Sequence, residues 1–220
     1  MATNYNSNII TDGLVFCLDA GDRKSYSGSG TTWYDRSGNG NNGSILSGVE
    51  YANNSFTADA QGEGIEVDFP QVTTWTISFW MKKNSNGVSA ARMAGTDPSY
   101  DRGEIAASGS TVLINGPNGS WTNAGTSFSN GETAHFTAIF DTSSTEDNVK
   151  FFKNGVNTLT ASQTGTTESG LPTGYVFFAR RDYNTEFLPS TLYQASLYNR
   201  ILTDAEILQN FNAQRGRFGI

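Results

Sequence analysis

The sequence predicts an all-β protein, a two-sheet antiparallel β-sandwich of the jelly-roll type with one short C-terminal helix. The 220 residues include 24 glycines, and Gly/Asn/Ser turns separate runs that are rich in threonine and aromatic residues. Several runs alternate with period two: Ile77, Phe79 and Met81 fall on one face of the run Trp75–Lys82, and Trp80 falls on the other. Only one segment, near the C-terminus, has the pattern of a helix.

Composition excludes several classes of function. The 14 Phe, 9 Tyr and 4 Trp residues are too much aromatic surface for a disordered chain. The net charge of −7 argues against nucleic acid as a partner, because phosphate binding needs an excess of Lys and Arg. The charge is compatible with neutral glycans and divalent cations. No segment reaches membrane-spanning length, so we expect no membrane insertion.

The single cysteine, Cys17, lies in an apolar run and is expected to be a buried small hydrophobe. One cysteine forms no internal disulfide, and the first six residues do not resemble a signal peptide. These features predict synthesis and folding in a reducing cytoplasm.

Two regions are expected along the chain. Residues 1–12 are polar and Asn-rich and predict a flexible N-terminal arm, and residues 13–220 form one domain that includes the C-terminal helix and tail. Turn residues divide the domain into short strands, predicted at Leu14–Asp19, Gly43–Leu46, Gly64–Phe69, Trp75–Lys82, Glu104–Ala107, Thr111–Asn115, Ala134–Asp141, Asn148–Lys153, Asn157–Ala161, Gly174–Ala179 and Thr191–Asn199.

The clearest hairpin surrounds Asn154-Gly155. These two residues separate an apolar run, 149–153, from a second run, 156–159. A type I′ turn needs positive φ at both central positions, and Asn-Gly is the pair that tolerates it best.

The helix is predicted over residues 203–214. Thr203 and Glu206 form a capping box, in which each side chain bonds to the other residue's backbone amide. An apolar stripe follows at Ile207, Leu208 and Phe211.

The loop from Asp35 to Gly43 has two interpretations. Its Gly and Asn residues predict a tightly turned segment. Side-chain oxygens recur at every second position, on Asp35, Ser37, Asn39 and Asn41, as in a calcium site. A well-hydrogen-bonded turn has the same pattern, and it is the interpretation we place first.

A second candidate calcium site lies at Asp97, Asp101 and Glu104, three acids within one stretch. In the alternative interpretation, Arg102 neutralises this charge. Zinc is not expected with one histidine and one cysteine.

Six blocks occur in order along the chain: Asp12–Ala20, the Asp35–Gly43 loop, Gly64–Val67, Trp75–Trp80, Phe151–Gly155 and Leu197–Ile207. Together they resemble the laminin-G-like, concanavalin A-like family of jelly-roll domains. The resemblance implies a fold whose members bind glycans, bind proteins, cap virions or hydrolyse β-glucans, and often bind calcium.

Three of the motifs resemble a subset of the family found in structural proteins of tailed bacteriophages and other viruses. These are the Asp12-Gly13-Leu14-Val15 strand, the loop 37–43 and the C-terminal segment 210–219. The resemblance implies a tail-fibre, capsid-fibre or head-decoration protein.

Catalysis is not expected. Hydrolases of this family carry Glu-x-Asp-x-x-Glu on one strand, whereas here Glu66 and Asp68 are followed by Gln71, which cannot donate a catalytic proton. The only histidine, His135, alternates with Phe136 in a strand pattern and has no nucleophile elbow near it.

Carbohydrate recognition would use an exposed aromatic ring with amide and charged groups beside it. Trp121 and Asn123 lie in a polar stretch where a buried tryptophan is hard to place, and Arg181 and Tyr183 lie in a similar one. The alternative is that these aromatic residues cover the edge of the sandwich or meet a neighbouring subunit.

We therefore expect a non-enzymatic virion structural protein on a phage head or fibre, made in the host cytoplasm and assisting adsorption by weak glycan binding. The arm 1–12 and the tail 215–220 would attach it to other capsid or tail proteins, and a homo-oligomer is expected. The alternatives are an extracellular carbohydrate-binding module or adhesin that binds host-surface polysaccharide, and a glucanase-like hydrolase.

Overall fold

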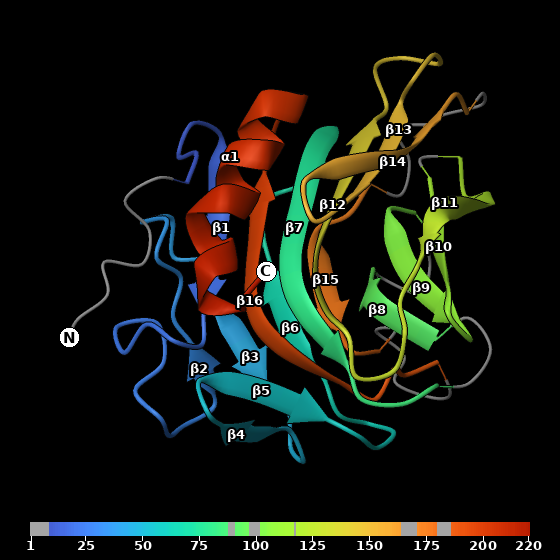
Figure 1. Ribbon diagram of the computed structural model, residues 1–220. Helices are drawn as coiled ribbons and strands as arrows, with labels where there is room; N and C mark the ends of the chain where they lie inside the picture. Colours follow the sequence, from blue (N-terminus) through green and yellow to red (C-terminus); the bar gives the residue numbers. More distant parts are fainter. Residues whose placement is uncertain (1–8, 88–90, 97–101, 117, 164–170, 180–185) are drawn as a thin grey trace.

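Two eight-stranded antiparallel sheets pack face to face (Figure 1). The computed structural model describes residues 9–87, 91–96, 102–116, 118–163, 171–179 and 186–220. One sheet, called sheet A, has the order β14-β13-β12-β7-β16-β5-β4, and β1 also pairs with β16. Sheet B has the order β11-β10-β9-β8-β15-β6-β3-β2. This confirms the predicted two-sheet sandwich.

The strands and helices are short. In chain order they are β1 Leu14–Asp19, β2 Thr32–Trp33, β3 Gly43–Ile45, β4 Glu50–Ala52, β5 Ser55–Ala58, β6 Ile65–Asp68, β7 Thr74–Lys83, β8 Ala91–Gly95, β9 Glu104–Ser108, β10 Thr111–Asn115, β11 Trp121–Ser127, β12 Thr133–Asp141, β13 Val149–Lys153, β14 Val156–Ala161, β15 Gly174–Phe177, β16 Ser190–Tyr198, the α-helix α1 Asp204–Gln214 and the 3₁₀ turn η1 Arg215–Arg217.

The core lies between the sheets and is built from alternate residues of each strand. Ile77 and Phe79 of β7 face it, as predicted, together with Trp75. Trp75 stacks on Phe140 of β12 with ring centroids 4.9 Å apart, and all four side chains are completely buried. Each such aromatic ring removes a large apolar area from water, which is the main favourable term in folding.

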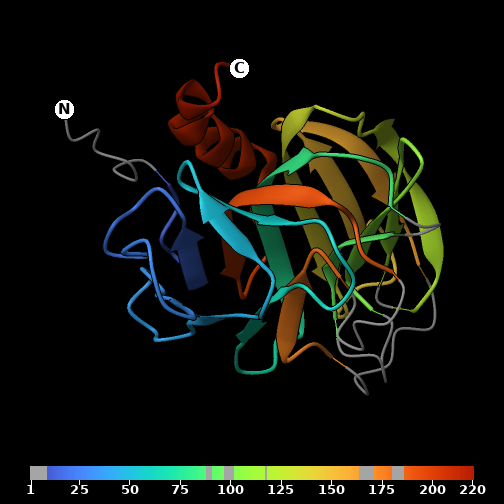
Figure 2. The ribbon, with the colours of Figure 1, turned by 90° about the horizontal axis from the view of Figure 1, so that it is seen from below.

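The helix covers the outer face of sheet A (Figures 1 and 2). Trp80, on the outward face of β7, stacks on Phe211 of α1 at 5.7 Å and donates from its indole nitrogen to Gln214 at 2.6 Å. The capping box of Thr203 and Glu206 is present as predicted. The apolar stripe therefore packs on this sheet through Phe211 and Ile207, and Leu208 stays 45% exposed.

The predicted hairpin is confirmed at β13–β14. Asn154 has φ 52° and Gly155 has φ 76°, the positive pair that a type I′ turn needs. The turn lies under α1, because a Cβ placed on Gly155 would come within 3.0 Å of Leu208 and 3.2 Å of Phe211.

Five observed strands have no counterpart among the predicted ones. They are β2, β4, β5, β8 and β11. Their sequences lack the alternation or the length by which a strand is predicted: β2 has two residues, and β11 consists mainly of small polar residues. These segments are strands because they pair with neighbouring strands, and the local sequence does not encode that pairing.

Residues 9–12 are fixed to the domain, in contrast to the predicted flexible arm over 1–12. The backbone amide of Ile10 donates to the side chain of Asn210 at 2.8 Å. Its carbonyl accepts from the hydroxyl of Tyr198 at 3.0 Å, and Asp12 forms an ion pair with Arg200 at 2.9 Å. The segment thus joins α1 to the end of β16.

The C-terminal tail, expected to attach the protein to other virion proteins, also packs on its own domain. Arg217 forms an ion pair with Asp19 of β1 at 2.6 Å. Phe218 stacks on Trp80 with ring centroids 4.0 Å apart. Of the hydrophobic side chains expected to seek a partner, Ile220 remains exposed at 44%.

The helix α1 has 11 residues, and no helix in the described ranges has the length and apolar character that a membrane crossing requires.

Candidate functional site

The carboxylate of Asp35 organises the Asp35–Gly43 loop. One oxygen accepts hydrogen bonds from the amides of Cys17 at 2.9 Å and Ser37 at 2.8 Å. The other accepts from the Ser37 hydroxyl at 2.6 Å and the Asn41 amide at 3.2 Å. Four hydrogen-bond donors of the chain thus occupy the two carboxylate oxygens that a calcium ion would need. The loop therefore has the geometry of a hydrogen-bonded turn.

The amides of this loop fasten it to β1. Asn39 Nδ2 donates to the carbonyls of Leu14 at 2.8 Å and Val15 at 3.1 Å, and Asn41 Nδ2 donates to Val15 at 2.8 Å. Gly38 and Gly40 have φ of 96° and 79°, a conformation that favours glycine. The loop is therefore held against the first strand at a defined position.

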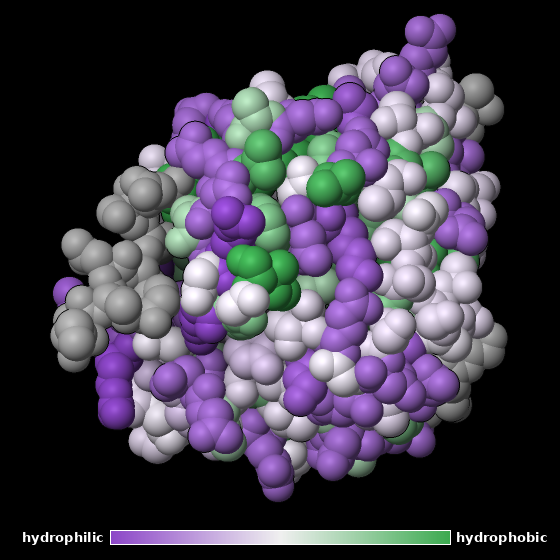
Figure 3. Space-filling view, viewed as in Figure 1, coloured by the Kyte–Doolittle hydropathy of each residue, from purple (hydrophilic) through white to green (hydrophobic). Residues whose placement is uncertain are grey.

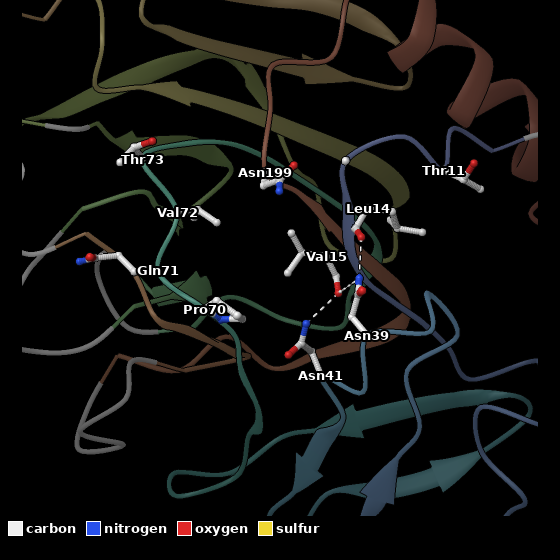
Figure 4. Close-up of a pocket in the computed structure, with 11 residues that line it drawn as sticks. Thr11, Leu14, Val15, Asn39, Asn41, Pro70, Gln71, Val72, Thr73 and Asn199 are labelled. Atoms are coloured by element: carbon white, nitrogen blue, oxygen red, sulfur yellow. Dashed lines mark hydrogen bonds between the residues drawn. The ribbon is translucent and has the colours of Figure 1, made fainter.

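A cleft of about 640 Å³ opens beside this loop (Figure 4). Its volume lies within the range of small-molecule sites, roughly 300–1,000 Å³. Four segments meet there: the start of β1, the loop, the β6–β7 connection at 70–73, and Asn199 after β16. Two of these segments, Gly13–Val15 and Asn39–Asn41, are already joined by the hydrogen bonds above.

A second polar site lies on the outward face of sheet B, at β11. Trp121 is 37% exposed, and the guanidinium of Arg92 lies 4.6 Å from the centre of its ring. Arg92 is itself only 3% exposed and forms ion pairs with Glu104 at 3.1 Å and Glu186 at 3.0 Å. The tryptophan ring is thus held from beneath by a buried cation, with its remaining surface open.

Three strands contribute a row of side chains to this site. Asn115 of β10 is directly opposite Glu104 of β9 on one side and Trp121 of β11 on the other. Opposite residues on neighbouring strands share a face of the sheet. Asn115 is fully buried, and neither atom of its amide group has a hydrogen-bond partner within the described part of the chain. Buried polar groups are nearly always paired, so this amide is an unusual group beneath the surface next to Trp121.

Several predicted site residues lie outside the described residues, namely Asp97, Asp101, Arg181 and Tyr183. The segment 180–185 is followed by Glu186, whose carboxylate pairs with Arg92 and whose carbonyl accepts from the Arg92 amide at 3.0 Å. Asn123 lies two residues beyond Trp121, exposed, with its side-chain oxygen accepting from Gly125 at 2.9 Å.

The predicted calcium ligands are not brought together in the described part of the chain, where no group of three His, Cys, Asp or Glu residues could hold a metal ion. Glu104 is directed at Arg92 and accepts from the Thr96 amide at 3.3 Å. Asn39 binds β1 through its amide nitrogen.

His135 and Cys17, the single imidazole and the single thiol, are structural. His135 is 1% exposed and contacts the rings of both Trp80 and Phe211, with ring centroids at 5.1 and 6.0 Å. Burial lowers the pKa of His135 to about 3. Cys17 is buried and its backbone amide is bound by Asp35.

The Glu66–Asp68 pair lies on β6, where it alternates with Ile65 and Val67 of the core. Asp68 is exposed and Glu66 is half-buried. The third position of the hydrolase pattern is Gln71, which lines the cleft.

The fold and these two polar sites define a jelly-roll β-sandwich of lectin-like architecture. A laminin-G family model, described as the concanavalin A-like lectin/glucanases superfamily, matches residues 46–208. The chain belongs to this superfamily, which confirms the resemblance in its sequence. No curated protein matches the chain.

Solved structures share the fold at low sequence identity. The ligand-binding domain of botulinum neurotoxin serotype D, in complex with N-acetylneuraminic acid, is 14% identical with a TM-score of 0.71, over 93% of this chain and 52% of that one. The binding domain of botulinum neurotoxin DC, in complex with rat synaptotagmin II, has a TM-score of 0.70 at 13% identity, with coverage of 93% and 52%. Trypanosoma rangeli sialidase has a TM-score of 0.69 at 15% identity, with coverage of 92% and 33%. This chain spans about half the length of the toxin domains.

Sequence reasoning identified Trp121 but missed Arg92, Asn115 and the cleft. Arg92 is the one charged residue in the short, otherwise small and apolar run Ala91–Gly95. A charge is unusual in a buried strand, and this was the sequence feature that could have indicated Arg92. Asn115 ends a predicted strand and carried no local signal.

Proposed function

We propose that the chain is a non-enzymatic, saccharide-binding structural module displayed on a virion surface. The observation that carries the binding function is the Trp121 site, an open indole ring held by buried Arg92 beside the unpaired amide of Asn115. The superfamily supports this proposal, and so does a structural neighbour that was solved with N-acetylneuraminic acid.

The chemistry of the site suits a sugar ring. The exposed part of the Trp121 indole offers a flat apolar surface to the C–H face of a pyranose, and the fully buried Asn115 lies beneath the surface beside it. Arg92 is neutralised by Glu104 and Glu186, so it positions the ring and does not supply net charge. Binding by a few such contacts is expected to be weak.

The site is less suited to glycoside hydrolysis. Hydrolysis needs one carboxyl group that donates a proton and a second carboxylate as base or nucleophile. Glu104 and Glu186 are both held in ion pairs with Arg92, which engages the two carboxylates of this site.

The test is a glycan array with neutral and sialylated sugars, probed with the full chain and with Trp121→Ala. Loss of an aromatic contact of about 1.4 kcal/mol weakens binding about tenfold. We expect Trp121→Ala to lose the array signal and Trp121→Phe to retain part of it.

Tyr34→Ala is the matched control, because Tyr34 is an exposed aromatic residue, at 53%, in the loop before Asp35. An array signal that survives Trp121→Ala would remove this residue from the binding site.

The proposed virion role rests on the sequence and is tested by particle binding. It is supported by the likeness of the Ser37–Gly43 loop and the segment 210–219 to viral structural proteins. We expect the protein to co-sediment with purified particles and to form a homo-oligomer by light scattering. Binding to isolated host polysaccharide without particle association would favour the extracellular adhesin, and release of reducing sugar would favour the hydrolase.

A further inference from the structure

The side of α1 that faces away from sheet A carries a shallow, uncharged groove. Phe211 and the other buried residues of the helix face the sheet. Ala205, Leu208 and Asn212 recur at spacings of three and four residues on the other side, and all three are exposed. The groove has a volume of about 560 Å³. We call its lining the α1 face, and it consists of Ala205, Leu208, Gln209, Asn212 and Ala213.

Exposed aliphatic side chains gather around the α1 face. Among the described residues the large aliphatic side chains that are exposed all belong to α1 or to a segment beside it. Leu208 lies on the helix, and Val156, which is 63% exposed, follows Gly155, where an added Cβ would come within 3.0 Å of Leu208. Ile201 and Ile220 lie in the segments that precede and follow the helix. Figure 3 shows this hydrophobic surface over α1 and beside it. Such a concentration on one face of a protein marks an interaction surface.

The two ends of the α1 face carry opposite charges. Asp204 begins the helix and Arg215 is its C-cap, and both are exposed. Glu206, the other charged residue of the helix, already forms an ion pair with Arg200, whereas Asp204 and Arg215 form none with a described residue. Eleven positions, about three helical turns, separate Asp204 from Arg215, so the two lie along the same side of the helix.

We propose that the α1 face is the interface of a two-fold symmetric homodimer in which the two α1 helices run antiparallel. In a two-fold dimer each copy presents the same surface to the other. The antiparallel arrangement places Asp204 of each copy beside Arg215 of the other, at both ends of the interface. Leu208 then lies near its counterpart at the centre. A parallel pair would instead bring Asp204 against Asp204 and Arg215 against Arg215.

The charge of the whole chain favours this surface for self-association. Each copy has a net charge of −7, so two copies repel each other over most of their surface. The α1 face avoids this repulsion, because its centre is uncharged and its ends balance one acid with one base. A helix of 11 residues is only about 16 Å long, so the interface is small and the dimer is weak. This interface specifies the homo-oligomer of the proposed function and is independent of saccharide and particle binding.

The experiment is sedimentation equilibrium of the purified full chain from micromolar to millimolar concentration. We expect the wild type to show a monomer–dimer equilibrium. Leu208→Glu places two like charges together at the centre of the interface and should weaken the dimer at least about tenfold. Tyr34→Glu is the matched control, since Tyr34 is an exposed aromatic residue in a different loop. The control should dimerise as the wild type does.

Charge reversal tests the antiparallel arrangement. Asp204→Arg and Arg215→Asp, each studied alone, bring like charges together at both ends of the interface and should weaken the dimer several-fold. An equimolar mixture of the two variants should dimerise about as tightly as the wild type, because opposite charges then meet at both ends again. These variants carry the test if Leu208→Glu does not fold, and circular dichroism reports the folding of each one.

Three results would overturn the proposal. The wild type could stay monomeric at millimolar concentration, as it would if another virion protein occupied the α1 face. A folded Leu208→Glu variant could dimerise as the wild type does, or the mixture of the two charge variants could dimerise no better than each variant alone. None of these results changes the glycan-array outcome at Trp121, so a failure of this interface is distinguishable from a failure of saccharide binding.

Discussion

At the scale of the residue, hydrogen-bond partners decide what each polar group can do. The amide of Asn115 and the carboxylate of Asp35 are both polar side chains on loops or strand ends of sheet B. Asp35 accepts four hydrogen bonds from its own chain, whereas the amide of Asn115 has none from the described residues. Asp35 is therefore a structural support of its loop, and Asn115 is a buried amide whose hydrogen-bonding capacity is unused.

His135 gives the protein a pH dependence that can be measured. Its pKa is lowered to about 3 by burial, against about 6.5 in the unfolded chain. Between these values the unfolded chain binds a proton that the folded one does not, so stability falls as the pH falls. We expect the free energy of unfolding to drop by about 2 kcal/mol from this group between pH 7.5 and pH 5, as measured by urea denaturation.

His135→Phe is the comparison, because it keeps a planar ring against Trp80 and Phe211. The variant should lose this part of the pH dependence. An equal drop in the variant would mean that another group causes it.

At the scale of the element, α1 is stabilised at its N-terminus by one carboxylate. Glu206 accepts from the Thr203 amide at 2.8 Å and forms an ion pair with Arg200 at 2.6 Å. The paired Arg200 guanidinium is the main cause that lowers the pKa of Glu206 to about 2. The ionised Glu206 carboxylate therefore contributes its full stabilisation of the folded state above about pH 4.5. This contribution is lost as the pH falls toward 2, because the carboxylate becomes protonated.

We expect Glu206→Gln to lower the free energy of unfolding by about 1 kcal/mol or less at pH 7, because glutamine keeps the capping hydrogen bonds but loses the ion pair with Arg200. The difference from wild type should shrink as the pH falls below about 4.5, because wild-type Glu206 then becomes protonated too. Asp204→Asn is the control, as an exposed acid in the same turn. An effect of Asp204→Asn equal to that of Glu206→Gln would point to the helix dipole and not to the ion pair with Arg200.

At the scale of the whole molecule, both ends of the described chain pack on sheet A and α1. Ile10 bonds to Asn210 and Tyr198, and Phe218 covers Trp80. Figure 3 shows hydrophobic surface over α1 divided by hydrophilic groups. The two ends of the described chain thus pack on the same domain to which they belong.

Deletion of residues 217–220 tests this packing. It removes the Phe218 ring from Trp80, which is fully buried, and the ion pair of Arg217 with Asp19. We expect a lower melting temperature and a red shift of tryptophan fluorescence. The full-length Phe218→Leu variant keeps an apolar side chain over Trp80, so its emission wavelength should stay close to that of the wild type. Unchanged fluorescence on deletion would mean that the tail does not shield Trp80.

The sequence by itself determined the elements whose patterns are local. The alternation of β7, the Asn154-Gly155 turn and the Thr203–Glu206 cap each depend on residues within a few positions of one another, so they were predicted correctly.

The two sites were decided by the tertiary structure. Trp121 meets Arg92 only because β11, β10, β9 and β8 are neighbours in sheet B, and Asn199 meets the Asn39–Asn41 loop only because β1 pairs with β16. No local pattern records such long-range pairing. For the same reason the Asp35–Gly43 loop, whose sequence alone is compatible with a cation site, becomes one wall of an uncharged cleft once its amides bind β1.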